Sequence, residues 1–169
     1  MIQEYDSAKT ARKQVGALLK KGVQRGLLKP GTVNLDLGGG PWDLGTEFLA
    51  AHGVESHVID PYNRDDLHNE SVALFLGRRG GADTVTLSNV LNVISTQGAR
   101  REALLTARSM LKPDGVILIS VYEGDKSGDS CPTRDGWQEH RKLVEYGAEV
   151  AAAGFIVELR WGIMIARPV

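Results

Sequence analysis

The chain has 169 residues, 42% apolar and 24% charged, which is the composition of a globular protein with one sizeable core. Its formal net charge of -1 indicates no global attraction to nucleic acids or acidic membranes, although a local basic patch is compatible with it. The single cysteine, Cys131, excludes an internal disulfide and argues against a cysteine-based zinc site, and no apolar run is long enough for a membrane span. We therefore expect one cytoplasmic domain over residues 1–169, without a membrane segment or a bound metal.

Predicted helices and strands alternate along most of the chain. In chain order they are a helix over 7–28, a strand over 32–37, a helix over 43–52, a strand over 55–59, a helix over 67–79, a strand over 82–88, a helix over 98–111, a strand over 116–121, a helix over 135–153, and strands over 155–160 and 163–167. A short strand over 72–76 is the alternative to the helix over 67–79. Residues 112–115 are predicted to form a tight turn, and residues 122–134 a polar loop.

The alternation predicts the fold class. Continuous apolar strands such as 116–121 are typical of a parallel sheet covered on both faces, so we expect an α/β, Rossmann-like, doubly wound, mostly parallel sheet in a three-layer sandwich. Trp161-Gly162 between the last two strands predicts a C-terminal antiparallel hairpin. Ligands of such sheets bind at the carboxyl ends of the strands. The segments expected there are Asp36–Trp42, Asp60–Arg64, Ser88–Asn92 and Tyr122–Asp125.

Three glycines, Gly38, Gly39 and Gly40, follow the first strand, and glycine lets a ligand approach the backbone closely. The spacing departs from the Gly-x-Gly-x-x-Gly pattern of dinucleotide folds. Asp36 precedes the glycines, and its carboxylate repels a pyrophosphate but attracts a cationic amino acid or sulfonium group. Asp60, 20 residues after Gly40, ends the second strand, where an acid accepts hydrogen bonds from ribose hydroxyls. These residues favour an adenosyl amino acid cofactor over NAD, and so argue against a nucleotide-dependent oxidoreductase.

At these residues the chain resembles the class I S-adenosylmethionine-dependent methyltransferases. Asp36-Leu37-Gly38-Gly39-Gly40-Pro41 is similar to the family's glycine loop, and Asp60 matches the acid at the end of its second strand. Met110–Val116 is similar to the family's turn into the fifth strand, and the terminal hairpin to its sixth and seventh strands. The resemblance covers nearly the whole chain and implies S-adenosylmethionine as cofactor and S-adenosylhomocysteine as product. An unrelated Rossmann-like fold with a glycine turn that serves packing is the alternative.

The resemblance implies a cofactor site that the N-terminal helix covers. Its expected residues are Asp36, Gly38, Gly39, Gly40, Trp42, Asp60, Pro61, Ser88 and Asn89. In the N-terminal helix, Tyr5, Lys9, Thr10 and Arg12 are candidates for contacts with the methionine carboxylate, with a solvated basic face as the alternative. The chain departs from the family between Asp60 and Thr84, where it is too short for a helix and a full third strand. We therefore expect that strand, and the adenine contacts near it, to be missing or displaced.

Candidates for catalysis lie where two later strands end. They are Asn89, Tyr122 and Glu123. Capping of the next helix is an equally good interpretation of Asn89, and capping or packing is the better one of Asn92. For Trp137 a core position is favoured over stacking on an acceptor, and for His140 a surface position over a catalytic base.

The sequence does not identify the methyl acceptor, which we leave open among a small molecule, a nucleic acid and a protein. The chain could also be a non-catalytic binding module, a subunit that needs a protein partner, or a homo-oligomer. The run Val90–Ile94 resembles one in methyltransferase-like proteins associated with DNA phosphorothioation. Similar small stand-alone proteins occur in phages, so a phage origin is compatible with the sequence.

Overall fold

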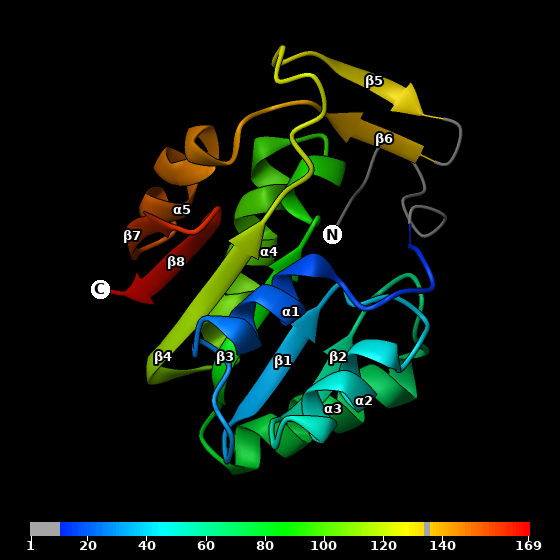
Figure 1. Ribbon diagram of the computed structural model, residues 1–169, viewed down its shortest axis with the longest axis vertical. Helices are drawn as coiled ribbons and strands as arrows, with labels where there is room; N and C mark the ends of the chain where they lie inside the picture. Colours follow the sequence, from blue (N-terminus) through cyan, green and yellow to red (C-terminus); the bar gives the residue numbers. More distant parts are fainter. Residues whose placement is uncertain (1–10, 134–135) are drawn as a thin grey trace.

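The computed structural model describes residues 11–133 and 136–169. They form a six-stranded sheet with the order β2-β1-β3-β4-β8-β7 (Figure 1). The strands are β1 (Val33–Leu37), β2 (Glu55–Ile59), β3 (Ala82–Ser88), β4 (Leu111–Ser120), β7 (Phe155–Arg160) and β8 (Ile163–Pro168). Strands β1 to β4 pair in parallel, whereas β8 is antiparallel to both β4 and β7. The predicted mostly parallel α/β sheet with a C-terminal antiparallel hairpin is therefore confirmed.

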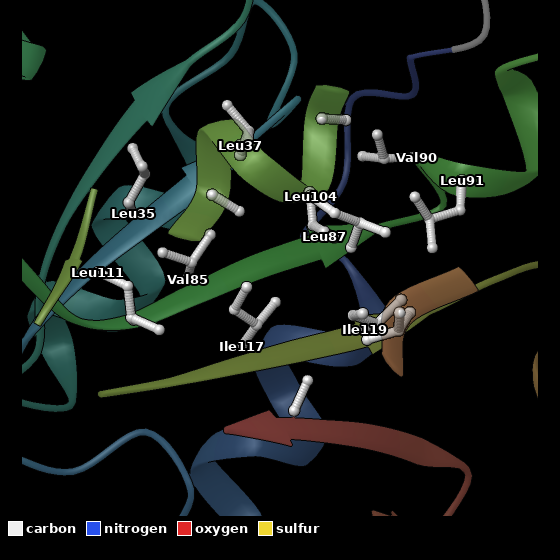
Figure 2. Close-up of a cluster of buried hydrophobic side chains, with 14 of the residues drawn as sticks. Leu35, Leu37, Val85, Leu87, Val90, Leu91, Leu104, Leu111, Ile117 and Ile119 are labelled. Atoms are coloured by element: carbon white, nitrogen blue, oxygen red, sulfur yellow. The ribbon is translucent and has the colours of Figure 1, made fainter. Parts of the chain in front are cut away.

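Helices cover both faces of the sheet. They are α1 (Ala17–Gln24), α2 (Leu44–Ala51), α3 (Asp66–Arg78), α4 (Gln97–Ser109) and α5 (Gly147–Ala152), with the 3₁₀ turns η2 (Leu91–Val93) and η3 (Leu143–Tyr146). Side chains alternate along each strand, so Leu118 of β4 packs in the cluster with α1 and α2. Ile117 and Ile119 pack in the cluster on the other face, with α3, α4 and α5 (Figure 2). The helix predicted over 67–79 is confirmed as α3, and the Asp65 side chain caps it by accepting from the backbone of His68.

The third strand expected of the resembled family is missing, as predicted. Strand β2 forms one edge of the sheet, and α3 runs from β2 directly to β3, which lies on the other side of β1. No helix in the part of the chain that the structure describes has the length and apolar composition needed to cross a membrane.

The N-terminal helix is shorter than predicted. It begins at Ala17, and Gly16 before it is extended, with φ -61° and ψ 144°. The prediction relied partly on alanines, which bury little surface, whereas Leu18 and Leu19 are buried in the core and Val15 packs against it. Residues 11–16 instead pass the carboxyl ends of the strands. A Cβ placed on Gly40 would lie 3.4 Å from the Cβ of Ala11, and one placed on Gly16 would lie 3.3 Å from Ser88 Oγ.

The predicted turn at 112–115 is wrong, because β4 runs through it with a shift in its pairing with β3. Lys112 holds this end of the strand to β3 by an ion pair of 2.6 Å with Asp83.

The predicted helix over 135–153 is also wrong. Its first part is β6 (Gly136–Glu139), paired antiparallel with β5 (Ser130–Thr133), and only η3 and α5 of the remainder are helical. The loop expected over 122–134 thus ends in a strand.

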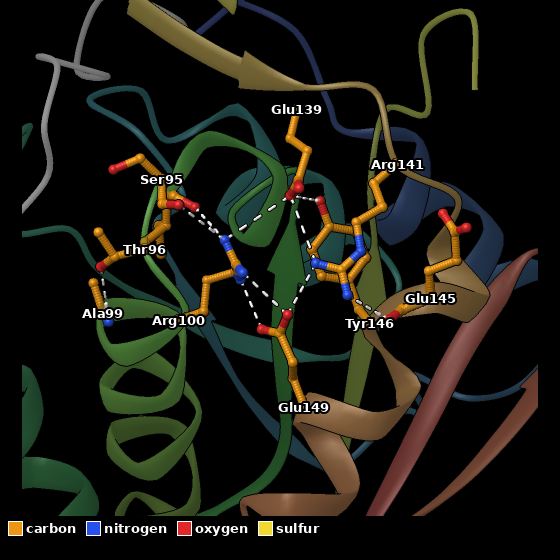
Figure 3. A network of polar contacts seen from close by, with 10 residues as sticks. Ser95, Thr96, Ala99, Arg100, Glu139, Arg141, Glu145, Tyr146 and Glu149 are labelled. Atoms are coloured by element: carbon orange, nitrogen blue, oxygen red, sulfur yellow. Dashed lines mark hydrogen bonds and ion pairs between the residues drawn. The ribbon is translucent and has the colours of Figure 1, made fainter. Parts of the chain in front are cut away.

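A buried ionic network replaces the expected helix and joins three separate segments (Figure 3). Arg100 of α4 donates to both carboxylate oxygens of Glu149, at 2.7 and 3.0 Å, and to the backbone oxygen of Ile94. Arg141 also donates to Glu149, and its guanidinium lies 4.2 Å from the ring centroid of Tyr146. The hydroxyl of Tyr146 donates to Glu139 at the end of β6. The network therefore fixes the β5–β6 hairpin relative to α4 and α5.

We expect Glu149→Gln to lower the free energy of unfolding by about 3 kcal/mol, because the buried guanidinium of Arg100 loses its two-bond carboxylate partner and keeps only Glu139, at 3.9 Å. The matched control is Glu158→Gln, which removes an exposed carboxylate paired with Arg160 and Arg167 and should cost less than about 1 kcal/mol. Urea unfolding followed by circular dichroism measures both. Equal losses in the two variants would show that the network around Glu149 stabilises the fold no more than an exposed ion pair does.

Candidate functional site

The glycine loop connects β1 to α2 at the carboxyl edge of the sheet. Gly38 and Gly40 both have φ of +81°, a conformation that side chains disfavour. Gly39 is required for another reason: a Cβ there would lie 2.6 Å from the Asp36 Oδ2 atom and 3.1 Å from Val58. The carboxylate of Asp36 therefore packs directly beneath the loop backbone.

The loop is held from the turn that follows β2. The backbone nitrogen of Gly40 donates to Asp60 Oδ2 at 2.9 Å. The other donors to this carboxylate are the backbone nitrogens of Tyr62 and Asn63, at 2.9 and 3.0 Å, and the side-chain amide of Asn63, at 3.1 Å. An ionised carboxylate offers about four acceptor positions, so these four bonds use its full capacity. Asp60 is only 3% exposed.

Two further residues, which the sequence did not single out, strengthen this connection between the glycine loop and the turn after β2. Arg64 Nε donates to the backbone oxygen of Gly40 at 2.9 Å, and its terminal nitrogen donates to Trp42 O and to Asp43 Oδ1. Asn69 of α3 accepts from the backbone nitrogen of Asp60 and donates to the Asp60 carbonyl. Arg64 lay inside the segment predicted at the sheet edge, but nothing in the pattern indicated that it reaches back to the loop.

Asp36 ends a buried row of polar side chains on the α1–α2 face of the sheet. Thr86 donates to Asp36 Oδ1 at 2.8 Å, and Asn34 donates to Thr86 and to Ser56 at 3.2 Å each. Burial raises the pKa of Asp36 to about 6, opposed by the hydrogen bond from Thr86 and reinforced by the nearby Asp60 carboxylate. Asp36 is thus an acid beneath the loop that ionises near pH 6 and is mostly ionised at neutral pH, suited to a cationic ligand group.

The remaining predicted cofactor residues gather at the same edge. Trp42 and Pro61 are exposed beside the loop and the turn after β2. Ser88 ends β3 next to Gly16 of the N-terminal segment. Asn89 has φ of +56° and is exposed, and its backbone nitrogen donates to the carbonyl of Ser120. The capping interpretation of Asn89 is wrong, because Thr96 caps α4. Asn92 is buried, as its packing interpretation requires.

The side expected to hold the methyl acceptor lies at the end of β4. Tyr122 is 57% exposed and meets the ring of His140 edge to face, with centroids 6.1 Å apart. Glu123 accepts from the backbone nitrogen of Leu143 at 2.8 Å and lies 3.6 Å from Lys126 Nζ, so one of its acceptor positions is used to hold the segment that leads into α5. An open hollow of about 470 Å³ lies here. It is lined by 121–124, 142–144, Leu159 and Gly162.

The β5–β6 hairpin lies against η2, just beyond the end of β3. Trp137 of this hairpin is buried, in agreement with its core interpretation, although it lies on a strand. His140 is half-buried and pairs with Asp125 at 3.2 Å. Tyr5, Lys9 and Thr10, predicted near the methionine carboxylate, lie outside the described residues, and Arg12 is exposed. Among the described side chains, no group of three His, Cys, Asp or Glu residues could hold a metal ion.

No family model and no curated protein matches the sequence. Solved structures do match the fold. The 1,6-didemethyltoxoflavin-N1-methyltransferase of Burkholderia thailandensis, solved with 1,6-didemethyltoxoflavin and S-adenosylhomocysteine bound, aligns with a TM-score of 0.67 and 20% identity over 91% of this chain and 79% of its own. An S-adenosylmethionine-dependent methyltransferase from Aquifex aeolicus aligns with a TM-score of 0.61 and 15% identity, over 92% and 91% of the two chains.

A third similar structure is CalS10, an amino pentose methyltransferase from Micromonospora echinaspora solved with S-adenosylmethionine bound, with a TM-score of 0.56 and 17% identity. It aligns over 93% of this chain and 92% of its own. At these identities the alignments establish the architecture. Together with the strand order and the antiparallel β8, they show that this chain has the Rossmann-like fold of the class I S-adenosylmethionine-dependent methyltransferases.

Proposed function

We propose that the protein binds S-adenosylmethionine at the glycine loop and transfers its methyl group to an acceptor bound beside Asn89 and Tyr122. The observation that carries this proposal is the position of Asp36 under the loop, within a fold shared with methyltransferases solved with adenosyl ligands. A buried carboxylate at this place opposes the pyrophosphate of a dinucleotide and attracts the ammonium or sulfonium of the adenosyl amino acid. An NAD-dependent enzyme is the less suitable interpretation.

In this proposal the cofactor lies along the carboxyl edge between the ends of β2 and β4. The methionine part contacts the loop over Asp36, under the segment 11–16 that passes Gly40 and Ser88. The ribose lies next to Asp60, and the sulfonium methyl points toward Asn89. The left-handed backbone of Asn89, held by the bond to Ser120, keeps its exposed amide at the edge where an acceptor would be oriented.

The four acceptor positions of the Asp60 carboxylate are all in use, so it can bind a ribose hydroxyl only if one of its present donors leaves. Its three backbone donors belong to the loop and the turn, whereas the fourth donor is the side chain of Asn63, whose departure would require no change of the backbone. A ribose hydroxyl would replace that amide at Asp60 Oδ2. The carboxylate would then bind the cofactor while it still holds the Gly40 nitrogen.

Methyl transfer needs little from the protein beyond alignment of the acceptor with the sulfonium, because orientation alone supplies a large part of the barrier reduction. Glu123, next to Tyr122 in the chain, uses one of its acceptor positions for the backbone nitrogen of Leu143. We propose an acceptor that is nucleophilic without a strong base, with Tyr122 and Asn89 as positioning groups.

Isothermal titration calorimetry with S-adenosylmethionine, S-adenosylhomocysteine and NAD tests the cofactor. We expect both adenosyl ligands to bind and NAD not to bind. Binding of NAD alone would overturn the proposal.

A labelled-methyl screen against nucleic acids, proteins and metabolites then separates a transferase from a binding module. Transfer to one class of acceptor supports the enzyme, and cofactor binding without any transfer supports the module.

Asp60→Asn is expected to weaken S-adenosylhomocysteine binding at least tenfold, because an amide cannot accept from both Gly40 and the ribose at full strength. The matched control is Asn63→Ala, which removes only the exchangeable donor and should leave the dissociation constant within threefold of the parent. Calorimetry gives both constants, and thermal unfolding checks that the variants fold. A loss in Asn63→Ala as large as that in Asp60→Asn would refute the exchange.

Affinity for S-adenosylhomocysteine is expected to rise from pH 5 to pH 7, because the ligand ammonium favours ionised Asp36, whose pKa in the free protein is about 6. Asp36→Asn should bind more weakly and lose this part of the pH dependence.

Because the folded protein holds the Asp36 proton more tightly than the unfolded chain, the free energy of unfolding should fall as pH rises from about 4 to 6 and then level off. Urea unfolding of Asp36→Asn should lack that fall; an unchanged profile would contradict the raised pKa.

A further inference from the structure

The turn between β7 and β8 carries a tryptophan in an unfavourable backbone conformation. Arg160 and Ile163 are paired, and Trp161 and Gly162 between them have φ of 55° and 72°. Such two-residue turns favour Asn or Gly at the first position, because a bulky side chain rarely adopts positive φ. Trp161 is nevertheless 37% exposed, so full burial does not compensate for the strain. Strain at an exposed residue indicates a functional constraint.

Three cations surround this residue. The guanidinium carbons of Arg160 and Arg25 lie 4.3 and 5.2 Å from the centroid of the Trp161 ring. Lys21 Nζ donates to the Trp161 carbonyl at 3.0 Å. We call Lys21, Arg25, Arg160 and Trp161 the tryptophan patch.

The tryptophan patch carries excess positive charge. Arg160 pairs at 3.5 Å with Glu158, which also pairs with Arg167. Neither Lys21 nor Arg25 forms an ion pair with a carboxylate of the described residues. The whole chain has a formal net charge of -1, so this concentration of cations is local. A gathering of like charges on a solvent-exposed surface suits an anionic ligand.

The patch adjoins the hollow on the proposed acceptor side. Leu159 and Gly162, which flank the patch residues Arg160 and Trp161, line the hollow beside Tyr122. Lys142 lines it as well, is exposed, and makes no ion pair with a described residue. Cations therefore extend from α1, across the β7–β8 turn, to the end of β4. An acceptor seated at Tyr122 would extend over them.

We propose that the acceptor is a single-stranded nucleic acid whose backbone phosphates bind the tryptophan patch, a proposal that rests on the methyltransferase function proposed above. Guanidiniums held against an aromatic ring present their forked donors to phosphate, and exposed aromatic and guanidinium planes stack on bases. Cations distributed over several elements suit repeated phosphates. A single strand is required because a base inside a duplex cannot reach an active site without leaving the stack.

Fluorescence anisotropy with labelled single-stranded DNA and RNA of about 20 nucleotides, without cofactor and over a range of salt concentrations, tests this surface. The double variant Lys21→Gln/Arg25→Gln should bind at least tenfold more weakly, with a salt slope reduced by about 1.4. The matched control is Arg78→Gln/Arg101→Gln, which removes the same charge from exposed positions on α3 and α4, against the opposite face of the sheet. We expect less than a twofold effect in this control.

Trp161→Asn separates binding from folding. Asparagine suits the turn, so the melting temperature should stay the same or rise, while oligonucleotide affinity should fall at least fivefold as both guanidiniums lose their support.

The proposal is overturned if the parent protein binds neither oligonucleotide at low salt, or if the Lys21/Arg25 double variant binds as tightly as its control. It is also overturned if inorganic polyphosphate binds as tightly as the oligonucleotides and Trp161→Asn weakens both equally. Because the assay contains no cofactor, failure to bind S-adenosylhomocysteine would contradict the methyltransferase function and leave this result unaffected.

Discussion

The hydrogen bond from the Gly40 backbone to the Asp60 carboxylate is the interaction on which the candidate site depends. It joins the loop after β1 to the turn after β2, two segments that the sheet brings side by side. Arg64 and Asn69 strengthen the same connection from either side. With the glycine loop fixed in this way, Asp36 is buried beneath it, and the burial gives Asp36 the raised pKa that suits a cationic ligand.

A second rigid unit lies at the opposite end of the carboxyl edge. The network around Glu149 anchors the β5–β6 hairpin and the segment leading into α5, and this segment includes Leu143, whose backbone fixes Glu123. The two ends of the edge, proposed above to hold the cofactor and the acceptor, are thus organised by different means. Backbone turns and one carboxylate organise the first, and the guanidiniums of the Glu149 network organise the second. The central strands β3 and β4 connect the two units, and the proposed methyl transfer would depend on the separation that they set.

The sequence predicted the sheet well because its strands are short, apolar and bounded by glycine or proline. The missing third strand followed from counting residues between Asp60 and Thr84. The prediction failed over 135–153, where Glu139, Arg141 and Glu149 pair across separate segments. Arg100 and Glu149 lie 49 positions apart, and no local pattern reveals such a pair. The hydrogen bonds from Arg64 to the glycine loop and the four donors already bound to Asp60 were equally hidden, because both depend on how the two loops meet.

The missing strand also changes the border of the sheet. It leaves β2 with one unpaired row of backbone groups, an arrangement that in other proteins invites pairing with a second chain. The strand is short, with only five residues, and it carries the polar pair Glu55 and His57, whose side chains lie 2.7 Å apart. The ring of Phe75 from α3 packs 4.6 Å from that of His57 beside this border. A fold shortened by one strand therefore ends in a short edge that offers few backbone groups for pairing with another strand.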